Sequence, residues 1–198
     1  MRAAASFDQA TTAVLQELGP QVFRYLVARA RDVALASDAF ARFSEDLWRG
    51  MPSYAGKSSL RVWVYAIARN ALSQELRGQK RHRARRSDFS DTLASRVADR
   101  IRTETAAWQR TEVKDAFARL QRELDQEEQE LLFLRTNERL GWEEIAEVCL
   151  QPAPSAAELK REAARLRKRF QLTRKKLRKL ARERGLLGEE DRQENDGS

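Results

Sequence analysis

Residues 47–77 carry the side chains best suited to act on a nucleic acid. A short polar loop, residues 53–59, leads into a stretch with helical spacing. That stretch contains Trp63, Tyr65, Arg69 and Asn70. Aromatic rings stack on base faces, Asn and Arg contact base edges, and Lys and Arg neutralise phosphates. Two interpretations follow: the segment captures unstacked bases, or its tryptophans fill the core of a helical domain.

A basic run follows directly. Residues 77–86 read RGQKRHRARR, with six Lys or Arg and no acidic residue. Like charges at this density repel one another, so the run either contacts a polyanion or remains a solvated linker. We favour phosphate contact, because counterion release stabilises each such contact at low salt. Residues 87–102 are polar and weakly periodic, which indicates a tether that becomes ordered on a partner.

Composition limits the classes of protein that this chain can form. Of 198 residues, 34% are charged and the formal net charge is +8, which favours a polyanionic partner. Gly and Pro are sparse and period-two runs of Val and Ile are absent, so the elements that position these side chains are helices. With a single cysteine, Cys149, and a single histidine, His82, we expect no disulfide framework, no metal site and no cofactor. Cys149 lies in an apolar run, where a buried structural thiol is expected.

The chain shows no sign of membrane insertion. No apolar stretch approaches the ~20 residues that span a bilayer. Charged, amphipathic sequence follows the first residues, in place of a hydrophobic signal core. We therefore expect a cytoplasmic protein.

Helical periodicity and helix-ending residues divide the N-terminal half into four helices. Residues 7–18 and 20–31 form the first two, with a break at Gly19-Pro20. The third spans about residues 35–49, and Ser58 or Ser59 caps the fourth. The apolar stripe of the third helix contains Leu35, Ala39, Phe40, Phe43 and Leu47, and the core face of the fourth contains Leu60, Trp63, Val64, Ile67 and Ala71.

The C-terminal half has the pattern of a helix-turn-helix. An amphipathic helix begins near residue 103, and the apolar run 131–134 lies on the next one. Residues 140–148 suit the short first helix of the motif, in which Ala146 lets two helices cross closely. The prolines within 150–154 forbid a continued helix.

A long basic helix closes this half. Ser155 and Glu158 have capping-box spacing and mark its start. Residues 160–184 hold thirteen Lys or Arg against two Glu. A basic helix after a turn is typical of a major-groove recognition helix, and we favour DNA binding. A solvated amphipathic, calmodulin-like or membrane-surface helix is the alternative.

The two halves together resemble extracytoplasmic-function (ECF) sigma factors of the sigma-70 family. SLRVWVYAIARNALSQELR, residues 59–77, is similar to their promoter-melting helix. LGWEEIAEV, residues 140–148, is similar to the helix before their turn, and LRKRFQLTRKKLR, residues 166–178, to their recognition helix. The resemblance covers roughly residues 7–187.

The resemblance implies three sets of contacts and two macromolecular partners, RNA polymerase core and promoter DNA. Contacts with the melted −10 element fall to Tyr54, Lys57, Ser58, Ser59, Arg61, Arg69, Asn70 and Arg77. Contacts with the −35 duplex fall to Arg167, Lys168, Gln171 and Arg174, with Lys160 and Arg161 added by the long turn. Contacts with core polymerase fall to Asp38, Phe40, Phe43 and Asp46. The family commonly also has an anti-sigma partner.

These observations predict an all-α protein of two small helical domains joined by a flexible tether, the C-terminal one a helix-turn-helix. Residues 1–80 bind polymerase and the −10 element, 81–104 are the basic and polar linker, 105–187 recognise the −35 element, and 188–198 are an acidic disordered tail. The predicted function is a sigma factor without enzymatic activity. A stand-alone helix-turn-helix regulator and a helical adaptor that binds an acidic protein are the alternatives.

Overall fold

The computed structural model describes residues 2–78, 92–112, 120, 122–150 and 154–186. Within these residues every regular element is a helix and no strand occurs, which confirms the predicted all-α class. Several predicted features lie outside the described residues: the basic run from residue 79, the tether up to residue 91, Pro152 of the turn, and the acidic tail.

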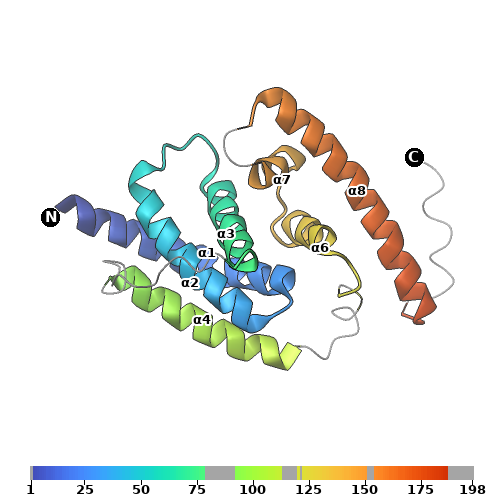
Figure 1. The fold of residues 1–198 in the computed structure, drawn as a ribbon, viewed down its shortest axis with the longest axis horizontal. Helices are drawn as coiled ribbons and strands as arrows, with labels where there is room; N and C mark the ends of the chain where they lie inside the picture. The colour runs from blue at the N-terminus through green and yellow to red at the C-terminus, as the bar shows by residue number, and fades with distance from the viewer. Residues whose placement is uncertain (1, 79–91, 113–119, 121, 151–153, 187–198) are drawn as a thin grey trace.

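Four helices form the N-terminal block (Figure 1). They are α1 (Arg2–Ala30), α2 (Val33–Gly50), α3 (Leu60–Leu76) and α4 (Leu93–Glu112), with a short 3-10 helix η1 (Met51–Ser53) after α2. Aromatic rings fill the centre of the block, where Phe23 meets Phe40 edge to face at 5.4 Å and Tyr25 meets Tyr65 at 5.3 Å. Each such pair of rings contributes about 0.5–1.5 kcal/mol to the stability of the fold, in addition to the free energy gained by burying the apolar area of the rings.

The predicted helix break at Gly19-Pro20 is wrong. Helix α1 continues through both residues, with Pro20 in its interior. A Cβ on Gly19 would lie 2.7 Å from Cδ1 of Ile101, so the glycine allows α4 to approach α1 closely instead of making a turn. Packing against α2 and α4 outweighs the hydrogen bond that the proline removes, since tertiary contacts supply most of a helix's stability.

Part of the predicted tether is an ordered helix. Residues 93–104, expected to be weakly periodic linker, form the first part of α4. Ala94, Val97, Ala98 and Ile101 are buried against α1 and α2. The carboxylate of Asp8 accepts hydrogen bonds from the backbone N–H groups of Leu93 and Ala94, both at 3.3 Å, and so caps the helix from α1. Its apolar residues have helical spacing, but the many charged residues between them make this period hard to recognise in the sequence.

Helix α3 begins as predicted but buries a wider surface than expected. Ser59 is its N-cap and accepts a hydrogen bond from the N–H of Val62 at 3.3 Å. Of the predicted core face, Val64 and Ala71 are buried, whereas Leu60, Trp63 and Ile67 are only half-buried. Four further residues of α3 are buried that were not predicted: Val62, Tyr65, Ala68 and Leu72. The reason is that α3 packs against α1 and α2 on one side and α7 on another.

The C-terminal block contains α6 (Gln126–Leu132), a π-helical turn η3 (Phe133–Asn137), α7 (Trp142–Cys149) and α8 (Ala156–Glu183). Capping boxes at Asp125/Glu128 and Ser155/Glu158 begin α6 and α8, the second as predicted. Ala146 is fully buried, and α7 packs against α8. In Figure 1, α8 runs along the outside of α6 and α7.

The two blocks pack against each other and share one continuous apolar core. Helix α3 contacts α7, and α1 contacts α6. The ring of Phe133 in η3 lies 5.7 Å from that of Tyr25 in α1. Cys149, predicted to be buried, is half-buried at the end of α7 beside this junction, and desolvation raises the pKa of its thiol to about 12.

Candidate nucleic-acid interface

Helix α8 presents two basic sides, one turned toward α6 and one toward solvent. At about 1.5 Å per residue, its 28 residues extend for roughly 42 Å. One face of α8 packs against the protein and buries its own residues Leu166, Phe170 and Thr173. The ring of Phe170 lies 5.4 Å from the ring of Trp142 in α7. These contacts fix which side of α8 faces outward.

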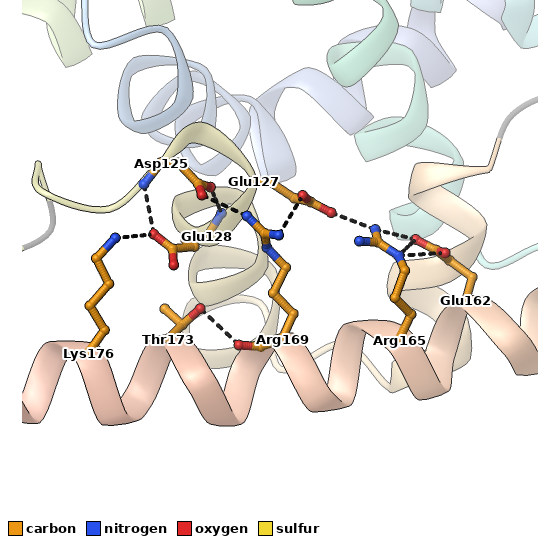
Figure 2. Close-up of polar contacts among 8 residues, drawn as sticks. All are labelled: Asp125, Glu127, Glu128, Glu162, Arg165, Arg169, Thr173 and Lys176. Carbon is orange, nitrogen blue, oxygen red and sulfur yellow. Dashed lines mark hydrogen bonds and ion pairs between the residues drawn. The ribbon is translucent and has the colours of Figure 1, made fainter.

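An ion-pair ladder between α6 and α8 holds the inner side (Figure 2). We define it by the carboxylates Asp125, Glu127, Glu128 and Glu162 and the cations Arg165, Arg169 and Lys176. Arg165 lies 2.5 Å from Glu127, Arg169 lies 2.7 Å from Asp125, and Lys176 lies 2.8 Å from Glu128. Exposed pairs contribute about 0–1 kcal/mol each, so the ladder orients α8 more than it stabilises the fold.

The outer side of α8 carries the predicted −35 residues. All six of these residues are exposed: Lys160, Arg161, Arg167, Lys168, Gln171 and Arg174. Within the described part of the chain, the five cations of this group take part in no ion pair of the ladder. Arg167 leans on the ring of Trp142, with its guanidinium carbon 5.9 Å from the ring centroid. Leu172, 57% exposed, stands among these cations. The outer side can therefore meet a polyanion without breaking an ion pair of the ladder.

A second candidate surface lies where the loop before α3 meets the helix. The rings of Tyr54 and Trp63 lie 4.7 Å apart and tilted by 34°. The Tyr54 hydroxyl donates a hydrogen bond to the carbonyl of Ser58 at 2.8 Å, which closes the loop on itself. Gly56 has a φ of +66°, a conformation that glycine adopts without strain. Lys57 is exposed at the tip.

Asn70 lies on the same side of α3 as Trp63, seven residues along the helix, and is exposed. Arg77, at the C-cap, is exposed as well. The side of α3 that continues from the loop is therefore partly accessible to solvent: Trp63 and Ile67 are half-buried and Asn70 is exposed. We call these three residues the open stripe of α3. Tyr65 is different: it is fully buried, where it cannot stack on a base. Burial, and next the charge of Glu138, raises the pKa of its hydroxyl.

Arg61 and Arg69 point away from this stripe, toward the C-terminal block. Arg69 Nε donates a hydrogen bond to Glu130 Oε1 at 3.1 Å. Arg61 Nη1 donates to the carbonyl of Glu138 at 3.2 Å, with a carboxylate oxygen of the same residue at 3.9 Å. The eight predicted −10 residues are therefore divided between an open surface and an interface inside the molecule.

The predicted polymerase-binding residues on α2 are divided as well. Asp38 is exposed, whereas Phe40 and Phe43 are buried in the core and offer no surface to a partner. Asp46 is half-buried, and desolvation raises the pKa of its carboxyl above the ordinary value. Phe40 and Phe43 belong to the apolar stripe of α2, which packs into the core.

The residues that sequence reasoning missed are those of the inter-block contact. Glu130 is the main one: its carboxylate is 3% exposed and receives the hydroxyl of Tyr25 at 2.5 Å. Arg29 Nε lies 3.4 Å from the same carboxylate. The only signal in the sequence was an acidic residue directly before the apolar run 131–134.

One family model matches the stretch of sequence that contains α2, the loop and α3. Residues 14–82 match the family model described as Sigma-70 region 2. This part of the chain is similar to a sigma-70 region 2. The match begins within α1 and covers all of α2, the loop and α3. No curated protein and no solved structure matches the chain.

The region 2 match supports a sigma-70 family member with a role in transcription initiation. The family of the matching model consists of transcription factors without enzymatic activity. Among the described helices, none is at once long and apolar enough to cross a membrane. In the same residues, no group of three or more His, Cys, Asp or Glu is placed to hold a metal ion.

Proposed function

We propose that the chain is a sigma factor of the ECF type, which directs RNA polymerase to specific promoters. Region 2 docks on core polymerase and holds the melted −10 element, and the C-terminal block binds the −35 duplex. The observation that carries the proposal is the region 2 match at residues 14–82, since a regulator or an adaptor has no need of that segment. The chain chemically alters no substrate in this role; strand opening uses binding free energy.

The outer side of α8 supports duplex binding by the C-terminal block. Helix α7 and the start of α8 follow each other as in a helix-turn-helix, where the second helix enters the major groove. Arg167 and Lys168 can donate to guanine edges, and Gln171 can pair with adenine. Leu172 is an exposed apolar side chain at the same surface and suits a thymine methyl group. The ladder keeps these side chains directed away from the protein.

The loop and the open stripe of α3 support capture of a single strand. Extruding a base costs a few kcal/mol, and stacking on an aromatic side chain returns about 1–3 kcal/mol per base. Trp63 and Tyr54 provide half-open rings, and Asn70 provides an amide for a base edge. Lys57 and Arg77, at opposite ends of the stripe, are placed to contact phosphates.

Run-off transcription with purified core polymerase on a promoter library tests the proposal. A sigma factor gives transcripts that depend on both the chain and core polymerase and that start downstream of a shared pair of sequence elements. A stand-alone regulator would bind duplex DNA without polymerase, at a palindrome. An adaptor would show no sequence preference. Absence of any complex with core polymerase would refute the proposed function.

A further inference from the structure

The indole ring of Trp142, at the start of α7, lies within reach of two arginines. The guanidinium carbon of Arg135 in η3 is 4.7 Å from the ring centroid, and that of Arg167 in α8 is 5.9 Å from it. A guanidinium within about 6 Å of a ring centroid is attracted by the face of the ring, and tryptophan attracts cations most strongly. The ring thus joins three elements, of which only α8 carries predicted −35 residues.

Contacts with other side chains fix the position of this ring. The ring of Phe170 meets it at 5.4 Å with an interplanar angle of 64°, and Phe170 is buried. Arg135 is itself held, because its Nη1 donates a hydrogen bond to the carbonyl of Leu140 at 2.7 Å. Phe170 follows Arg167 by three residues, so the two side chains are neighbours on the surface of α8. The ring that packs on Phe170 is therefore a firm support beside Arg167.

Arg167 differs from the arginines of the ladder in the kind of partner it has. Arg165 and Arg169 lie against carboxylates, which occupy their N–H donors. Arg167 takes no part in the ladder, and its contact is with an aromatic ring. A guanidinium carries five N–H donors and can contact a ring while some of them remain available. The side chain of Arg167 can therefore stay on the ring and still donate to a base edge.

Fixing Arg167 before it meets DNA affects which sequences bind. A flexible side chain that becomes immobile on binding lowers the affinity, and a contact already made in the free protein removes part of this cost. A bidentate arginine contact also depends on direction, because the planar N–H donors must face O6 and N7 of one guanine. A ring that restricts Arg167 therefore favours one base pair, whereas contacts with phosphates carry no sequence information.

We propose that Trp142 is a positioning residue for base reading by α8. Its ring holds the Arg167 guanidinium in one orientation on the outer side of α8, so Trp142 acts on DNA through Arg167. The proposal rests on the proposed function, since it concerns the −35 surface of that function. It adds a residue of α7, outside the predicted −35 set, to the determinants of sequence specificity.

The test is a double-variant cycle of Trp142→Leu and Arg167→Ala, made in the full chain bound to core polymerase. The parent first selects its preferred sequence from a library of randomised duplex DNA. The affinities of the parent, both single variants and the double variant are then measured for that duplex and for each of its single-base-pair variants. Trp48→Leu is the matched control, because Trp48 is also a half-buried tryptophan but lies in α2 of the N-terminal block. Circular dichroism confirms that each variant is folded.

We expect Arg167→Ala to lose discrimination at one base pair by about fivefold or more. Trp142→Leu should lose about two- to fivefold at the same base pair, the range for an exposed cation–π contact, and none at the others. In the Arg167→Ala background, Trp142→Leu should change the discrimination no further. Its salt dependence should equal that of the parent, because no charge is removed. Trp48→Leu should keep the base-pair preference of the parent.

Three results overturn the proposal: parental discrimination in Trp142→Leu or in Arg167→Ala, an equal loss of affinity for every duplex in Trp142→Leu, or a loss at one base pair that persists in the Arg167→Ala background. If Trp142→Leu is unfolded, Trp142→Phe takes its place, because phenylalanine keeps a ring but attracts a cation less strongly. A smaller loss at the same base pair is then expected, and parental discrimination overturns the proposal.

Failure of the proposed function looks different, because in that case no complex with core polymerase forms. The same selection and the same cycle are then carried out with the full chain alone. A base-pair-specific loss shared by Trp142→Leu and Arg167→Ala would still support the positioning role. A parent that prefers no duplex sequence over another would overturn it.

Discussion

Arg69 on α3 and Glu130 on α6 join the N-terminal and C-terminal blocks, with Nε and Oε1 3.1 Å apart although the two residues are 61 positions apart in the chain. Asn70, the next residue, faces solvent. Two neighbours in one helix thus differ in this conformation: Arg69 binds the C-terminal block, and Asn70 is exposed to a partner. The predicted −10 residues cannot be tested as a single surface.

Asn70→Ala should impair promoter opening without destabilising the protein. The side chain is exposed, and exposed substitutions usually change the free energy of unfolding by no more than about 0.5 kcal/mol. A captured base would lose its edge contact and stack again. Permanganate reactivity of −10 thymines should fall, and a pre-melted bubble template should restore transcription.

Asn137→Ala is the control for this prediction, because Asn137 is also an exposed amide but lies in η3, away from the stripe. Normal permanganate reactivity in Asn70→Ala would place the base contact elsewhere, first of all in the loop at residues 54–59. A large loss of thermal stability would show that the amide is structural.

Arg167→Ala and Arg165→Ala should separate the two sides of α8. Arg167 faces outward, and its loss should weaken duplex binding and flatten the salt slope by about one unit. If it reads a guanine, its loss should also relax sequence preference by about 1–3 kcal/mol. Arg165 lies in the ladder, paired with Glu127 and Glu162, so its loss should lower stability by about 0.5–1 kcal/mol and leave duplex affinity unchanged.

Fluorescence anisotropy on duplex DNA and urea unfolding measure these two effects. Lys168→Ala provides a second outward variant, also exposed and outside the ladder. If both outward variants bind like the parent, the long turn has shifted the register of α8, and Lys160 and Arg161 at its N-terminal end become the candidates.

The helices themselves were largely predictable from local sequence. Ser59 and Ser155 cap α3 and α8 as expected, because capping depends on residues within one turn. The predictions of local structure fail where contacts between residues far apart in the chain determine the conformation. Gly19-Pro20 reads locally as a break, yet Gly19 makes room for Ile101, more than eighty positions away in the chain. The first part of α4, residues 93–102, was not predicted because its apolar residues are spread among many charged ones.

Of the candidate site residues, only those exposed on the surface were predicted correctly from the sequence. Asn70 and the cations of α8 are exposed, as a surface role requires. Phe40, Phe43 and Tyr65 have the residue types of a binding surface, but the same types build cores, and all three are buried. The pairing of Arg69 with Glu130 depends on how the two blocks pack, and no local pattern encodes it.

Asp38→Arg should weaken the complex with core polymerase. Asp38 is exposed on α2, so reversal of its charge leaves the core of the helix intact. Asp46, the other acidic residue predicted for this contact, is half-buried with a raised pKa, and its replacement would also disturb packing. We expect an affinity about tenfold lower, measured by titration of labelled protein with core polymerase.

Asp99→Arg on α4 controls for the change in net charge, because Asp99 is 62% exposed and lies outside the region 2 match. An equal loss in both variants would indicate long-range electrostatics in place of a contact. An unaltered affinity in Asp38→Arg would remove Asp38 from the interface.

Asp125→Asn should remove part of the acid sensitivity of the C-terminal block. Burial alone would raise the pKa of Asp125, but hydrogen bonds from the Glu128 N–H and the Arg169 guanidinium lower it below the ordinary value. A carboxyl with a lowered pKa in the folded protein stabilises the fold above its unfolded pKa of ~3.9, and this stability is lost as the pH falls through the folded pKa. Because Asn caps helices about as well as Asp, the variant should lose only the charge interaction.

Urea unfolding followed by circular dichroism at a series of pH values measures this difference. At pH 7 Asp125→Asn should be less stable than the parent by about 0.5–1 kcal/mol, the range for an exposed ion pair together with the helix dipole. The difference should shrink below about pH 4 and vanish once the parent carboxyl is protonated. Asp125→Ala should cost about 1 kcal/mol more than Asp125→Asn at every pH, because it also removes the cap of α6. A constant difference between parent and Asp125→Asn down to pH 2 would show that the carboxylate contributes no charge interaction to the ladder.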